Sequence, residues 1–103
     1  MLAAQTTVFL RGILIAALFV LAACETMPVQ EMSDARQAIS AAREAGAEEH
    51  AAEQLLAAES ALESAEESLS TRNYGVARQE AMAAKTAAID ALRLSEAARD
   101  AEN

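Results

Sequence analysis

The feature that most constrains this chain is the spacing of its alanines from Asp34 onward. Alanine recurs there at intervals of three and four residues, and Glu, Gln, Arg and Leu fill most of the other positions. These residues are strong helix formers, and such intervals place side chains on one face of a helix. No window alternates polar and apolar residues as a half-buried strand would. The pattern predicts an all-α fold.

Two interruptions divide this region into three predicted helices, at residues 31–45, 52–70 and 74–101. Gly46 can end the first helix, and Asn73 is a good N-cap for the last one. Each helix carries an apolar seam with the heptad-like spacing of helices that pack together. The predicted seams are Met32, Ala35, Ile39 and Ala42; Leu55, Ala58, Leu62, Ala65 and Leu69; and Tyr74, Ala77, Ala81, Ala84, Ala88 and Ala91, widened by Met82, Ile89 and Leu92.

The break at Gly46 allows two arrangements of these helices. If the chain reverses there, the helices form a small up-down-up three-helix bundle, which we favour because residues 46–51 leave room for a turn. If the chain only kinks, the first two helices together match the third in a long kinked helical hairpin. Because alanine seams bury little apolar area, we expect a shallow core that gains stability from self-association or from a partner.

A short apolar segment, Gly12–Ala23, precedes the only cysteine, Cys24. The segment follows Arg11 and ends in small residues, which is the organisation of a secretory signal. A membrane span needs about 20 apolar residues. Extending the segment backward to reach that length would place Arg11 in the bilayer, at a cost of roughly 2.5–3.5 kcal/mol. We therefore predict that residues 1–23 are a cleaved signal peptide.

The residues at the end of this segment, Leu21-Ala22-Ala23-Cys24, resemble the lipobox of bacterial lipoproteins. The resemblance implies that the lipoprotein signal peptidase recognises Leu21, Ala22 and Ala23. It also implies a diacylglycerol thioether and an N-acyl chain, typically palmitate, on Cys24. Cysteine supplies the soft sulfur nucleophile that this alkylation requires. Two or three acyl chains hold a protein on a bilayer almost permanently, so membrane lipid is the first predicted partner.

The predicted mature chain consists of a lipidated tether at residues 24–33 and an alanine-rich helical domain at residues 34–103. It carries seven basic and sixteen acidic residues, a net charge of −9. This balance argues against nucleic acid as a partner, and against adhesion to anionic lipid by charge. Glu25 follows the cysteine, and in enterobacterial sorting, which this junction resembles, residues other than Asp direct a lipoprotein to the outer membrane. We expect the periplasmic face of the outer membrane rather than the inner membrane.

A second resemblance covers residues 28–95. The run Gly-Ala-Glu-Glu-His-Ala at residues 46–51, the Leu/Ala seam after it and the run Asn-Tyr-Gly-Val-Ala at residues 73–77 are similar to an envelope lipoprotein module known as domain of unknown function 4398. His50 stands where that family usually has Tyr, and Ala52 where it has Pro. The resemblance implies a helical fold in the cell envelope, and the family's activity is uncharacterised.

Catalytic candidates are few in this sequence. His50 is the only histidine, and the only cysteine is the predicted lipid site. Carboxylate catalysis requires burial to shift a pKa, whereas the acids here belong to polar helix faces. We therefore expect no catalysis, no cofactor and no metal.

A row of acids on the second predicted helix is a candidate partner surface: Glu59, Glu63, Glu66 and Glu67. Like charges four residues apart mildly destabilise an isolated helix. The row suits a basic partner or basic residues of the third helix, namely Arg78, Lys85, Arg93 and Arg99. The simpler interpretation, which we favour, is a solvated face that keeps the helix soluble.

The sequence therefore favours a lipid-anchored envelope protein with a structural or protein-interaction role, acting as a homo-oligomer or with an envelope protein partner. A second hypothesis is a cell-wall tether similar to the murein lipoprotein, which implies proximity to peptidoglycan. That class ends in a lysine joined to the cell wall, whereas this sequence ends Asp100-Ala101-Glu102-Asn103, so we expect no covalent link. A third hypothesis is an accessory subunit of an envelope complex.

Overall fold

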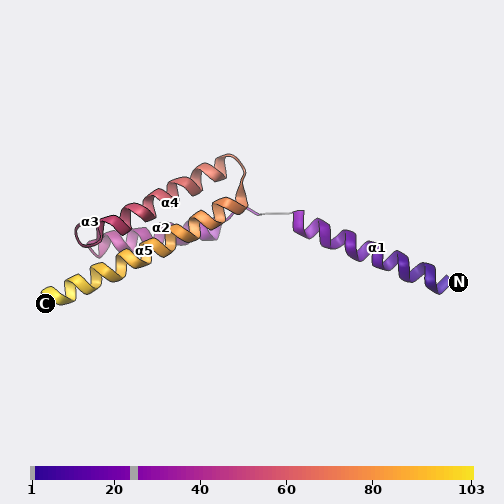
Figure 1. Ribbon diagram of the computed structural model, residues 1–103, viewed down its shortest axis with the longest axis horizontal. Coiled ribbons are helices and arrows are strands. Elements are labelled where there is room, and N and C mark those ends of the chain that lie inside the picture. Colours follow the sequence, from indigo (N-terminus) through magenta and orange to yellow (C-terminus); the bar gives the residue numbers. More distant parts are fainter. Residues whose placement is uncertain (1, 24–25) are drawn as a thin grey trace.

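The computed structural model describes residues 2–23 and 26–103, and every regular element in them is a helix. The all-α prediction is therefore confirmed for these residues. The molecule is extended, with dimensions of 80 × 29 × 15 Å, and α1 stands apart from the other described helices (Figure 1). In chain order the helices are α1 (Leu2–Ala23), α2 (Val29–Glu44), α3 (Ala47–His50), α4 (Ala52–Ser70) and α5 (Tyr74–Glu102).

Helices α2, α4 and α5 pack side by side and alternate in direction along the chain (Figure 1). Glu31 near the start of α2 pairs with Arg78 near the start of α5, so these two helices are parallel. Arg36 on α2 pairs with Glu66 near the end of α4, so α4 is antiparallel to α2. The chain therefore reverses between α2 and α4, and the two do not form one kinked helix. Helix α5 packs extensively against both, whereas α2 and α4 contact each other less.

The reversal occurs at Gly46, whose φ is 92°. Glycine adopts this left-handed conformation without the steric cost that a Cβ atom brings. The N–H of Gly46 donates to the carbonyl of Arg43 at 3.0 Å and ends α2, as its place in the sequence predicted. The short helix α3 then occupies the turn, with Ala47 buried. Periodicity did not predict α3, because four residues are too few to show a helical pattern.

The predicted seams supply most of the core. All four seam residues of α2 are buried, and so are the five seam alanines of α5. On α4 the seam residues Leu55, Ala58 and Ala65 are buried, while Leu62 and Leu69 pack against the core from half-buried positions. Since most of these side chains are single methyl groups, the helices approach closely over a shallow core.

The edges of the α5 seam differ from the prediction. Met82 and Ile89 do not widen the seam, because they are 55% and 41% exposed. Each follows a fully buried alanine, and one residue further along a helix is rotated by about 100°, which takes these side chains away from the narrow contact with α2 and α4. Leu92 is half-buried and packs against the core as predicted. The seam continues instead to buried Ser95, whose hydroxyl donates to the carbonyl of Ala91 at 2.7 Å.

Helix α2 begins at Val29, inside the segment predicted to be a tether. Pro28 immediately precedes the helix and is fully buried. Its carbonyl accepts the N–H of Met32 at 3.0 Å, and its missing N–H is no loss where a helix starts. Residues 28–33, which we predicted to belong to a tether, therefore pack as part of the helical domain.

Candidate functional site

The predicted lipid-attachment site follows directly on α1, which ends at Ala23. Cys24 lies outside the described residues, as do the side chains of Leu21, Ala22 and Ala23. Among the residues that the structure describes, no helix combines the length and the apolar character needed to cross a membrane.

The segment after Cys24 is held against the helical domain by Arg78. The Nη2 of Arg78 donates to the carbonyl of Thr26 at 3.0 Å. Its Nε lies 3.3 Å from Oε1 of Glu31, so one guanidinium on α5 joins Thr26 to α2. Arg78 is about one-third exposed, which places these contacts at the rim of the core. Sequence analysis missed this role, because it depends on α2 and α5 being parallel neighbours.

The predicted partner surface on α4 is partly occupied by arginines of α2. Arg43 donates to Glu59, and Nη2 of Arg36 lies 3.2 Å from Oε1 of Glu66. Glu63 lies with these two pairs along a groove whose apolar lining is Ile39 and Leu62. Glu67 is exposed, and its carbonyl accepts the hydroxyl of Ser70 at 2.7 Å. The structure therefore gathers Glu59, Glu63 and Glu66, but not Glu67, around a mixed-charge groove between α2 and α4.

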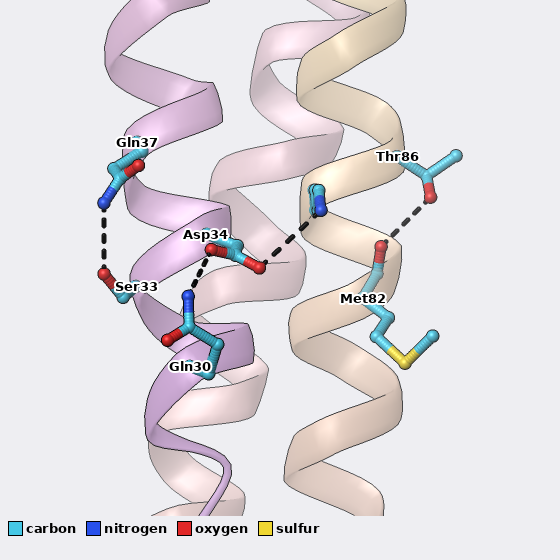
Figure 2. A network of polar contacts seen from close by, with 7 residues as sticks. Gln30, Ser33, Asp34, Gln37, Met82 and Thr86 are labelled. Atoms are coloured by element: carbon cyan, nitrogen blue, oxygen red, sulfur yellow. Dashed lines mark hydrogen bonds and ion pairs between the residues drawn. The ribbon is translucent and has the colours of Figure 1, made fainter.

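Three of the basic residues that we considered as partners for the acidic row pair elsewhere. Arg78 contacts Glu31, Lys85 lies 3.6 Å from Asp34, and Arg93 donates to Asp90 on its own helix. Figure 2 shows that Asp34 also accepts a hydrogen bond from Gln30, at 2.8 Å. In this region α2 and α5 are thus joined by polar contacts beside their buried seams.

His50 ends α3 in a half-buried position beside Gly46. Its Nε2 lies 3.9 Å from a carboxylate oxygen of Glu49 and 4.0 Å from one of Glu102. These distances bring the turn region and the C-terminal end of α5 together at one end of the domain. Within residues 2–23 and 26–103, no three His, Cys, Asp or Glu side chains form a group that could hold a metal ion.

The pair of Arg43 and Glu59 is expected to contribute only about 0.2–1 kcal/mol to stability, because both side chains are substantially exposed. The single changes Arg43→Ala and Glu59→Ala and the double change form a cycle that isolates this coupling in urea unfolding. The coupling should shrink as salt is added. A coupling well above that range, or one insensitive to salt, would show that the pair is a structural element rather than a solvated contact.

No protein family, no curated protein and no solved structure matches this chain. The likenesses to the lipobox and to domain of unknown function 4398 therefore stay predictions from the sequence. A function for the chain has to be argued from its own residues.

Proposed function

We propose that this chain is the precursor of a lipid-anchored bacterial envelope protein with a structural or protein-interaction role and no catalytic one. The observation that carries the proposal is the junction Leu21-Ala22-Ala23-Cys24, which follows Arg11 and a short apolar segment. Cleavage after Ala23 makes Cys24 the first residue, with a diacylglycerol on its sulfur and an acyl chain on its amino group. The same junction, followed by Glu25, favours the periplasmic face of the outer membrane.

The domain that this anchor holds is, in our proposal, an up-down-up three-helix bundle of α2, α4 and α5. Its support is the packing of α5 on both other helices and the antiparallel pairing of α2 with α4. Its shallow alanine core favours a second copy or an envelope protein as a stabilising partner. The resemblance to domain of unknown function 4398 is consistent with this fold and location. Peptidoglycan lies close to the periplasmic face of the outer membrane, so the domain is near it in our proposal.

Growth of a bacterial host with labelled palmitate tests the lipid anchor. The wild-type chain should incorporate label and fractionate with membranes, since each buried methylene contributes about 0.8 kcal/mol and several chains act together. Cys24→Ser should remove the label and, because the lipidated cysteine is required for processing at a lipobox, should leave the leader attached. Ser33→Cys, which carries a second cysteine outside the lipobox, is the matched control and should be labelled no more than the wild type. Equal labelling of Cys24→Ser and the wild type, or no label in either, would overturn the proposal.

A further inference from the structure

The chain that follows the predicted lipid site is fixed to one end of the helical domain almost at once. The carbonyl of Thr26 accepts from Arg78, and Pro28 is fully buried. Only Glu25 separates Thr26 from Cys24. Because one residue spans at most about 3.6 Å, covalent geometry keeps the backbone of Thr26 within about 7 Å of that of Cys24. The attachment point is therefore close to Arg78.

The end of the domain near Arg78 combines exposed apolar side chains with the exposed Arg72 and with two exposed acids near the end of α4, Glu66 and Glu67. Met27 and Val29 are 53% and 68% exposed there. The turn between α4 and α5 lies at this same end (Figure 1) and carries the exposed Arg72, which has a left-handed φ of 62°. Exposed apolar residues beside an arginine suit the boundary between acyl chains and phosphate headgroups.

The opposite end of the domain is acidic. The contact of His50 with Glu102 brings α3 and the end of α5 together there. Helix α5 has 29 residues, which corresponds to about 43 Å, or roughly five times the distance over which physiological salt screens charge. The exposed charged residues at this far end are six acids and one base: Glu44, Glu48, Glu49, Glu53, Asp100 and Glu102, with Arg99.

We propose that Arg78 orients the domain on the lipid surface, with Met27, Val29 and Arg72 at the level of the headgroups and the acidic end directed away. This inference rests on the lipid anchor proposed above. Because the tether is this short, the end of the domain near Arg78 stays close to the bilayer, and the acidic end cannot take its place there. The apolar side chains gain from entering the interface, Arg72 is attracted to phosphate, and the acidic end is repelled by anionic lipid. The far end is then the one presented to the periplasm.

Lipidated protein in vesicles of phosphatidylethanolamine and phosphatidylglycerol, with a quencher on some headgroups, tests this orientation. Cys24 is consumed by its thioether, so a cysteine introduced at Thr71 or at Glu49 can be labelled alone with a fluorophore. Quenching is expected to be several-fold stronger for Thr71→Cys, in the turn, than for Glu49→Cys, in α3. Equal quenching at the two positions in protein that floats with the vesicles would overturn the orientation. Failure to float would instead reject the lipid anchor itself.

The role of Arg78 is tested in the same vesicles. Arg78→Ala removes the hydrogen bond to Thr26 and should reduce the difference in quenching between the two labelled positions. Arg93→Ala is the matched control, because Arg93 pairs within α5 and should leave the difference intact. Arg78→Lys, which keeps a charge beside Glu31, replaces Arg78→Ala if circular dichroism shows that the alanine variant is unfolded. An unchanged difference in a folded Arg78 variant would show that Arg78 does not orient the domain.

Discussion

Replacing Leu55 with alanine is expected to lower the free energy of unfolding by about 2–5 kcal/mol, the cost of removing a large core side chain. Leu55 is 4% exposed and lies in the core cluster where α2, α3, α4 and α5 meet. Its neighbour Leu56 is 64% exposed, so Leu56→Ala should change stability by no more than about 0.5 kcal/mol. The two substitutions remove the same atoms from adjacent positions of one helix, and only their burial differs.

Urea unfolding of the mature chain, followed by circular dichroism, measures this difference. Both leucine variants are produced as residues 24–103, without the leader and with Cys24→Ser, which keeps acyl chains and detergent out of the transition. A domain of this size has a small free energy of unfolding, so the Leu55→Ala variant is expected to be partly unfolded before urea is added. Similar losses for Leu55→Ala and Leu56→Ala would mean that the described core is not the one that holds the helices together.

Enlarging a seam alanine is expected to have the second largest effect. Ala88 is fully buried on α5 within the same core cluster, and Ala88→Leu adds three carbon atoms where the helices are in close contact. Overpacking of this kind costs about 1–3 kcal/mol. Ala83 lies on the exposed face of α5, and leucine is nearly as good a helix former as alanine, so Ala83→Leu should be close to neutral.

The same urea transitions check this second pair of variants. The sign of the result is informative, because a cavity beside Ala88 would let the larger side chain stabilise the domain. Stabilisation by Ala88→Leu, or equal effects of Ala88→Leu and Ala83→Leu, would therefore contradict a closely packed alanine seam. A destabilising Ala88→Leu together with a nearly neutral Ala83→Leu would establish that alanine is required at the seam for its small size and not only for its helix propensity.

The long helices could be predicted from the sequence because their signals are local and repeated. The expected helix at residues 52–70 coincides with α4, and the one at residues 74–101 differs from α5 by a single residue at its end. Strong helix formers fill both segments, and Asn73 immediately precedes the first residue of α5. Gly46 likewise marked the end of the first helix, which is a local property, whereas the choice between a reversal, which we favoured, and a kink was left open by the sequence.

The features that sequence analysis missed depend on contacts between segments. Met82 and Ile89 were predicted to be core residues because they are large and apolar. In the structure both are exposed, because the closely packed helices leave no room for them in the core. The row containing Glu59 was interpreted as a solvated face, with basic residues of the third helix as an alternative partner. In the structure Arg43 on α2 pairs with Glu59, because α2 is antiparallel to α4. Pro28 was assigned to the tether, because its burial depends on the helices that pack around it.

The candidate site also combines a feature that could be predicted from the sequence with one that could not. The lipobox is a pattern in consecutive residues, so Cys24 could be singled out from the sequence alone. The hydrogen bond of Arg78 joins two residues that are 52 positions apart in the chain, and no local sequence pattern predicts such a contact. The sequence thus predicts a lipid at Cys24, whereas the proposed orientation of the domain rests on a contact that only the structure shows.

The parallel packing of α2 on α5 has a consequence for the order of events during synthesis. Helix α2 emerges from the ribosome first among the packed helices, but the partner that it contacts most, α5, emerges last. Contacts between segments so distant in the chain form late, because the intervening loop must first be closed. The nascent chain therefore lacks its complete core until α5 has been synthesised, and the seams of α2 and α4 stay partly uncovered until then.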